Sequence, residues 1–200
     1  GSYEVGMHIY RSFAAAPWPR PCIAEMGGKN AAIVSRKADL DRAAMGIMRS
    51  AFGLQGQKCS ACSRVYVERA AAGGLREKLV RATEAIQIGD PTERDNWMGP
   101  VINREAYGKY KKCLDNLVQH GKIFTGGTQL TSGALADGYY CAPTVATAPH
   151  DYRLWREEKF VPIVLVGEVD SVEEAIQCAN ASEYGLTAGF YGGGDEIEGF

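Results

Sequence analysis

The sequence of 200 residues contains no apolar run that approaches the roughly 20 residues a helix needs to cross a bilayer. It has no block of basic residues either, because 22 lysines and arginines are balanced by 24 aspartates and glutamates, for a net charge of −2. That balance excludes the basic footprint of proteins that bind nucleic acid or anionic membranes. No charged-then-apolar leader opens the chain. We therefore expect a small-molecule partner and a cytoplasmic location, or the mitochondrial matrix in a eukaryote.

Patterns for disulfides and metals are also scarce. The six cysteines are scattered, so we expect reduced thiols rather than a disulfide framework. Cys59 and Cys62 form one Cys-x-x-Cys pair, a spacing that also suits redox exchange or half a zinc site. No second pair exists, the three histidines stand far apart, and the pair follows a helical segment rather than a strand. We expect no metal site, and we predict that Cys62 traps Cys59 as a disulfide under oxidation.

The overall composition is that of a globular protein. It is 46% hydrophobic with 24 glycines and only 8 prolines, which is typical of one soluble α/β domain. Buried-strand patterns alternate with amphipathic helical patterns, and this alternation predicts an open, mostly parallel twisted sheet with helices on both faces. The expected strands lie near 31–34, 65–67, 122–125, 139–145, 162–166 and 184–191, and the expected helices near 39–52, 70–86, 104–120 and 171–181.

The most informative run is Gly56-Gln57-Lys58-Cys59-Ser60-Ala61, which places a thiol in a glycine-entered turn directly after the expected helix at 39–52. Such a turn leaves the sulfur accessible, and nearby backbone N–H groups can stabilise a thiolate or an oxyanion. A buried structural thiol is the alternative for any single cysteine. The flanking residues favour a nucleophile at Cys59, because reactive cysteines occupy such distinct surroundings.

A carboxylate followed by two glycines leads into the expected strand at 31–34. In Glu25-Met26-Gly27-Gly28, the glycines let the backbone approach a reacting centre closely. A general base must reach the acyl carbon directly or through one water. An exposed glutamate without a role is the alternative, but few such residues precede a glycine pair at a buried strand. We therefore predict that Glu25 is a general base.

Glu25 and Cys59, which stand 34 positions apart, together resemble the catalytic core of the aldehyde dehydrogenase superfamily. The stretch 180–189 is also similar to that superfamily, so the resemblance covers nearly the whole chain. It implies the fold of the family's catalytic domain and a reaction in which Cys59 attacks an aldehyde. The thiohemiacetal gives up hydride, and Glu25 activates the water that hydrolyses the resulting acyl-thioester.

The resemblance also implies cofactor-binding residues. The segment from Glu158 to Pro162 is similar to one in which the glutamate holds the nicotinamide ribose and the phenylalanine, here Phe160, packs near the nicotinamide ring. Val161 departs from the glycine usual there, and a solvated charged loop is the alternative interpretation. Ser2 resembles a serine that meets the cofactor pyrophosphate at a helix N-terminus, while a cloning scar at the first two residues is the competing explanation.

Within the superfamily, the run 52–64 looks most like pyrroline-5-carboxylate dehydrogenases, which oxidise glutamate semialdehyde to glutamate in proline catabolism. This similarity implies that Ser60 hydrogen-bonds a small polar substrate. A CoA-acylating semialdehyde dehydrogenase is one alternative, disfavoured because that chemistry needs no hydrolytic base such as Glu25. A non-catalytic scaffold relative of the same fold is another.

Residues 1–200 correspond in the family to the thiol-bearing catalytic domain. We expect the family's amino-terminal cofactor domain, with its oxyanion asparagine, and the carboxy-terminal end to lie outside this chain, which has no Gly-x-Gly-x-x-Gly motif. The chain alone is therefore expected to bind no nicotinamide cofactor and to have no dehydrogenase turnover. Its parent is expected to use NAD, with NADP not excluded, and to form a homo-oligomer.

Overall fold

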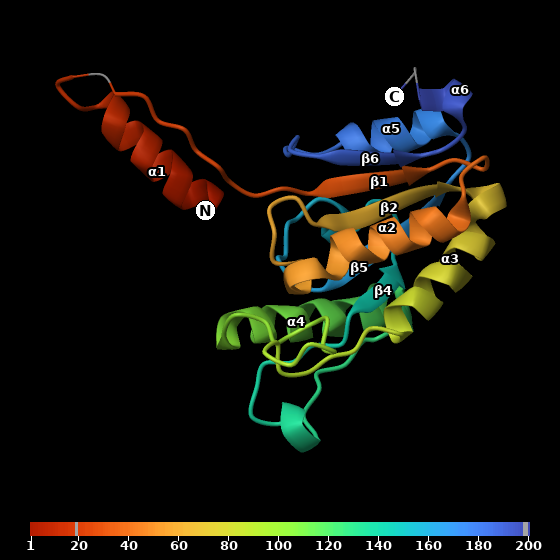
Figure 1. Cartoon of the computed structure of the whole chain (residues 1–200). Coiled ribbons are helices and arrows are strands. Elements are labelled where there is room, and N and C mark those ends of the chain that lie inside the picture. The colour runs from red at the N-terminus through yellow and green to blue at the C-terminus, as the bar shows by residue number, and fades with distance from the viewer. Residues whose placement is uncertain (19, 198–199) are drawn as a thin grey trace.

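A six-stranded sheet forms the body of the molecule in the computed structural model, which describes residues 1–18, 20–197 and 200 (Figure 1). Its strand order is β3-β4-β5-β2-β1-β6. Neighbouring strands pair in parallel except β3, which is antiparallel to β4 at one edge. The predicted open, mostly parallel sheet is confirmed. The strands are β1 (Asn30–Val34), β2 (Cys62–Glu68), β3 (Lys122–Thr125), β4 (Thr144–Thr147), β5 (Ile163–Val169) and β6 (Ala188–Tyr191).

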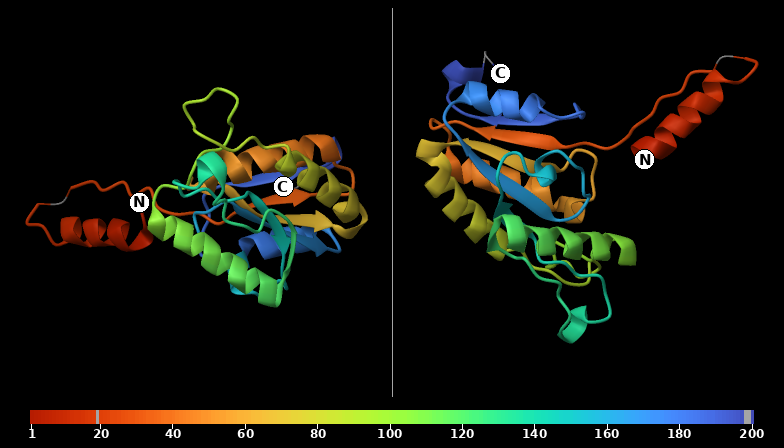
Figure 2. Two further views of the ribbon diagram at one scale, coloured as in Figure 1. Left: turned by 90° about the horizontal axis from the view of Figure 1, so that it is seen from below. Right: turned by 180° about the vertical axis from the view of Figure 1, so that it is seen from behind.

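Helices cover both faces of the sheet, as predicted (Figures 1 and 2). Helices α2 (Leu40–Phe52) and α3 (Arg69–Glu84) share one hydrophobic cluster with β1, β2, β4 and β5. On the opposite face, α4 (Arg104–His120) and α5 (Val172–Asn180) pack with the alternate side chains of the same strands. The short helix α6 (Gly194–Ile197) follows β6. None of the described helices has the length and apolar character of a membrane span.

Local sequence signals explain where most of these elements begin. Strand β1 is buried at all five positions, as expected for a strand covered on both faces. Helix α2 begins after Asp39, whose carboxylate accepts two backbone N–H groups of the first turn. Helix α5 begins after Ser171, which accepts from Glu174 N at 3.2 Å, while the Glu174 carboxylate accepts from Asp170 N at 2.7 Å. The capping box is thus present, with its return bond placed one residue early.

Two expected strands are shorter in the structure. The segment 139–145 forms a strand only from Thr144, and 184–191 only from Ala188. Before those points the described residues include a turn at Tyr139 and a bend at Leu186, and the one bridge given for them is that of Cys141 with Gln129. Extended conformation is a local property, whereas strand pairing depends on a neighbouring segment.

The amino-terminal helix α1 (Tyr3–Ala14) stands apart from the sheet (Figures 1 and 2). None of its residues is buried. An extended segment returns from it to β1, and the amino group of Gly1 donates to the Glu25 carbonyl in that segment at 2.7 Å. Helix α1 and the returning segment therefore form an arm, residues 1–18 and 20–29, that leads into the first strand.

A buried arginine ties several elements to β2. Arg64 is 3% exposed, and its Nε donates to the Lys29 carbonyl and its Nη2 to the Ala179 carbonyl, both at 2.8 Å. Nη1 lies 3.4 Å from the carbonyls of Trp155 and Cys178. Because these acceptors come from the end of the arm, the end of α5 and the turn 153–155, one guanidinium connects three parts of the fold.

We expect Arg64→Lys to lower the free energy of unfolding by about 3 kcal/mol, because an ammonium cannot match the planar fork and leaves buried carbonyls without donors. Urea unfolding followed by circular dichroism measures the change. Arg42→Lys, at an exposed arginine of α2, is the matched control and should lie within about 0.5 kcal/mol of the wild type. Equal stability of the two variants would show that the guanidinium bonds do not hold the fold together.

Candidate active site

Three loops meet at the amino-terminal edge of the sheet. The segments 25–29, 57–61 and 156–162 precede β1, β2 and β5, respectively. Because these strands are adjacent and parallel in the order β5-β2-β1, the loops that enter them lie side by side. The sequence-predicted residues Glu25, Cys59 and Glu158 are carried by these three loops, one on each.

The turn that carries Cys59 is built from unusual backbone. After α2, the 3-10 turn Gly53–Gly56 contains Leu54 and Gln55, whose φ angles of 54° and 58° are in the left-handed region. Side chains other than glycine adopt that region at a cost of about 1 kcal/mol or more each. Gly56 has φ 69°, and a Cβ there would lie 2.6 Å from the Val161 carbonyl oxygen. Close packing against the loop before β5 therefore holds this strained turn in place.

Asn30 fastens the Cys59 turn to β1. Its Nδ2 donates to the Cys59 carbonyl at 2.7 Å and to the Ala61 carbonyl at 3.0 Å, and its Oδ1 accepts from Thr187 N at 3.1 Å. The side chain is 4% exposed. Sequence reasoning did not single out this residue, because its partners lie far away along the chain. Its one signal is a polar residue at the start of a buried strand.

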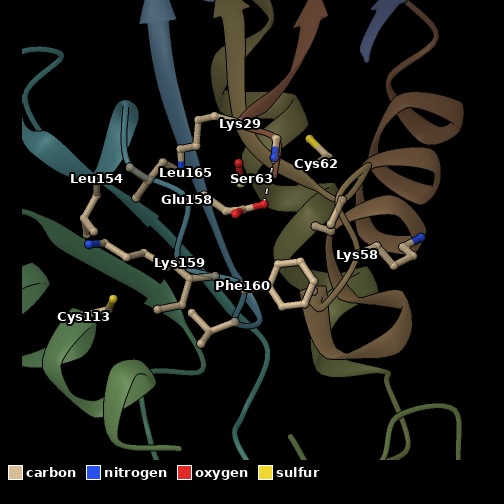
Figure 3. A pocket seen from close by; sticks show the side chains of 16 residues that line it. Lys29, Lys58, Cys62, Ser63, Cys113, Leu154, Glu158, Lys159, Phe160 and Leu165 are labelled. Atoms are coloured by element: carbon tan, nitrogen blue, oxygen red, sulfur yellow. Dashed lines mark hydrogen bonds between the residues drawn. The ribbon is translucent and has the colours of Figure 1, made fainter. Parts of the chain in front are cut away.

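The glycine pair brings the three loops into contact. A Cβ on Gly28 would overlap the Cys59 carbonyl oxygen, and a Cβ on Gly27 would overlap Oε2 of Glu158. The Gly28 N–H donates to Oε1 of Glu158 at 2.8 Å, the bond drawn as a dashed line in Figure 3. The close backbone approach predicted from these glycines is present. Gly28 is therefore the point where the arm that carries Glu25, the cysteine turn and the loop before β5 touch.

The candidate residues differ in their exposure to solvent. Cys59 is half-buried in its turn, whereas Ser60 beside it is exposed. Glu25 is exposed on the arm, three residues before Gly28. Ser2 is the N-cap of α1, and its Oγ accepts from Val5 N at 3.4 Å. The structure thus gathers the Cys59 turn and Glu158 tightly, while Glu25 and Ser2 lie on the arm that stands off the sheet.

A small cavity of about 30 Å³ lies beside these loops and is large enough for a water molecule (Figure 3). Phe160 lines it, with φ 60° and 42% of the residue exposed. The left-handed residue of this loop is therefore Phe160, and Val161 is buried in an ordinary conformation. The departure from glycine at position 161 is tolerated for that reason. Other lining residues include Lys29, Lys58, Cys62, Cys113, Glu158 and Lys159.

Burial shifts the pKa values of two titratable groups that line this cavity. Lys29 is 5% exposed, and burial, with the nearby positive charge of Arg64, lowers its pKa to about 7. Burial raises the pKa of Cys62 to about 11. Both members of the Cys59–Cys62 pair are free thiols, but Cys62 is held protonated inside the core. Cys59 is therefore the accessible thiol of the pair, and the disulfide trap stays a prediction.

Comparison with known proteins gives consistent results. The model of the aldehyde dehydrogenase family matches residues 1–196. The 1-pyrroline-5-carboxylate dehydrogenase of Geobacillus kaustophilus (strain HTA426) is 40% identical over 192 residues, which cover 94% of this chain and 36% of that protein. The chain therefore spans about a third of the length of the curated relatives it matches.

Solved structures show the same similarity. The 1-pyrroline-5-carboxylate dehydrogenase from Thermus with bound NAD superposes with a TM-score of 0.90 at 37% identity, covering 99% of this chain and 39% of that one. An apo betaine aldehyde dehydrogenase from Staphylococcus aureus gives a TM-score of 0.91 at 32% identity, covering 98% and 39%.

The low pKa of Lys29 predicts a pH-dependent stability. Between pH about 7 and about 10.4 the unfolded state binds more protons than the folded state, so this group makes the wild type more stable as the pH rises. Lys29→Met removes the effect. We expect the variant to be more stable than the wild type at pH 6, and its advantage to shrink by about 2 kcal/mol between pH 7 and 9.

Urea unfolding across this pH range measures the free energy of unfolding of both proteins. In the difference between them, the titration of the groups that both proteins share cancels. Lys112→Met, at an exposed lysine of α4, is the control and should show no pH-dependent difference from the wild type. If the difference in unfolding free energy between Lys29→Met and the wild type did not change with pH, it would contradict the lowered pKa of the buried amine.

Proposed function

The chain belongs to the aldehyde dehydrogenase family, and from this premise we propose that residues 1–200 are the thiol-bearing catalytic domain of an NAD(P)-dependent enzyme that oxidises glutamate semialdehyde to glutamate. The observation that carries the proposal is the contact at Gly28, which joins the Cys59 turn, the arm with Glu25 and the carboxylate of Glu158. The similarity to 1-pyrroline-5-carboxylate dehydrogenases supports this choice of aldehyde.

The proposed reaction uses the accessible thiol as a nucleophile. The Cys59 sulfur loses its proton and forms a bond to the aldehyde carbon, and the resulting thiohemiacetal becomes an acyl-thioester when its carbon loses a hydride. A nicotinamide cofactor, held by Glu158 and Phe160, would supply the acceptor for that hydride. Glu25 then takes a proton from a water that attacks the thioester carbon, the sulfur–carbon bond breaks, and the acid leaves with Cys59 regenerated. Ser60, exposed beside the thiol, hydrogen-bonds the polar substrate.

The residues in place suit a nicotinamide cofactor. The carboxylate of Glu158 can accept hydrogen bonds from the ribose hydroxyls, since Gly28 uses only Oε1. The ring of the half-exposed Phe160 offers an apolar surface for the nicotinamide. Ser2 caps a helix of 12 residues, whose N-terminus favours a phosphate.

The parent protein is proposed to contain an amino-terminal cofactor domain and a carboxy-terminal end beyond this chain. It is proposed to be a cytoplasmic homo-oligomer, with NAD as cofactor and NADP as the alternative. The length of the relatives supports the presence of these further parts, because the chain covers 36% of the Geobacillus protein.

Single substitutions in the complete gene product test the two catalytic roles. Cys59→Ala should abolish NADH formation with glutamate semialdehyde, because no other group forms the thioester. Glu25→Gln should keep a first turnover of NADH but slow the steady state by about 10² or more, since a general base contributes on that order. Stopped-flow absorbance separates the first turnover from the steady state.

Cys178→Ala, at a half-buried cysteine of α5, is the matched control and should leave the turnover within about twofold. Residual turnover in Cys59→Ala would remove the nucleophile assignment. Turnover that depends on added CoA would instead favour the CoA-acylating alternative, and a protein silent with every aldehyde would favour the scaffold.

A further inference from the structure

The carboxylate of Glu158 is seated on the glycine pair of the arm. Oε1 accepts the Gly28 N–H at 2.8 Å across 130 residues of sequence, and Oε2 occupies the space that a Cβ on Gly27 would need. Figure 3 shows the Glu158 side chain pointing toward this turn. Among the residues that the structure describes, no ion pair with a lysine or arginine involves Glu158. Its charge is therefore directed at the backbone N–H, which makes this bond charge-assisted and strong.

The bond between Gly28 and Glu158 lies between a residue that is fixed in the sheet and the exposed Glu25. Asn30, two residues after Gly28, is fixed in β1 by its side-chain hydrogen bonds. Glu25 lies three residues before Gly28 and is exposed. Two adjacent glycines have the greatest backbone freedom of any residues, so without a further restraint they would let the arm swing. The Glu158 bond is a restraint at the glycines themselves.

We propose that Glu158 is a positioning residue for Glu25, in addition to its cofactor role. By fixing the Gly27–Gly28 turn, it sets the direction in which the arm leaves β1 and thereby holds the Glu25 carboxylate within reach of the thioester on Cys59. This inference rests on the proposed roles of Cys59 and Glu25. It predicts that Glu158 affects hydrolysis of the acyl-enzyme even when no cofactor is present.

An activated ester tests this without a nicotinamide cofactor. p-Nitrophenyl acetate acylates a nucleophilic thiol in a burst of p-nitrophenol, and hydrolysis of the thioester then sets the steady-state rate. In the complete gene product, Glu158→Met should keep the burst amplitude and lose about tenfold in the steady-state rate, because its thioether is a poor acceptor for the Gly28 N–H. Glu158→Gln keeps a carbonyl acceptor but not the charge, so it should lose less than Glu158→Met, about threefold. Glu93→Met, at an exposed glutamate far along the chain, is the matched control.

A double-mutant cycle identifies Glu25 as the residue through which Glu158 acts. In the Glu25→Gln background, Glu158→Met should cause no further loss in the steady-state rate. An equal tenfold loss in both backgrounds would overturn the positioning role, as would an unchanged steady-state rate for Glu158→Met. If Glu158→Met fails to fold by circular dichroism, Gly27→Ala replaces it, because the added Cβ displaces the same carboxylate, and the same pattern is expected.

The failure of this inference is distinguishable from failure of the proposed function. A wild-type protein that gives no burst, or a burst that survives Cys59→Ala, would remove the nucleophile assignment and this inference with it. A burst that requires Cys59, followed by hydrolysis that is insensitive to Glu158→Met, would overturn this inference alone. A loss of the burst in Glu158→Met, with the burst intact in Glu158→Gln, would place the residue in acylation and also contradict the positioning of Glu25.

Discussion

The arrangement of the site depends on the absence of side chains at two consecutive positions. Gly28 packs against the carbonyl oxygen of Cys59 and donates its N–H to Glu158, and Gly27 leaves room for the same carboxylate. A β-carbon at position 28 would collide with the backbone of the Cys59 turn, and one at position 27 would displace the Glu158 carboxylate. The rest of the molecule supplies the frame for this contact: the parallel pairing of three adjacent strands sets the loops side by side, and Asn30 and Arg64 tie them to the body of the fold.

The candidate site lies at the amino-terminal edge of the parallel strands, whereas open α/β sheets most often bind ligands beyond the carboxyl ends. The reason is local. Helix α2 ends in the strained turn 53–56, so the chain presents Cys59 just before β2 begins instead of after it ends. The opposite edge, by contrast, carries exposed ion pairs such as Arg69 with Asp170 at 2.7 Å. Exposed pairs of this kind contribute little to stability.

Sequence reasoning found the features that local patterns encode. Alternating strand and helix signals gave the architecture, and the glycines beside Glu25 and Cys59 indicated close backbone approach, which the structure contains. It missed Asn30, Lys29 and Arg64, because their roles arise from contacts with residues distant in the sequence, up to 115 positions away for Arg64. It also noted Val161 as the departure from a family glycine in the loop before β5, although the residue with left-handed backbone is its neighbour Phe160. Which residue of a loop takes an unusual φ depends on packing that the sequence does not display.

The arm also affects how the chain behaves in solution. Tyr3, Val5, Ile9 and Tyr10 of α1 are each more than 40% exposed, and the helix buries no residue of its own. A lone amphipathic helix of 12 residues is marginal in water without a partner surface. In isolation, the polypeptide would therefore be cleaved first by proteases within the largely exposed residues 20–25, and the apolar face of α1 would be the first surface through which copies associate.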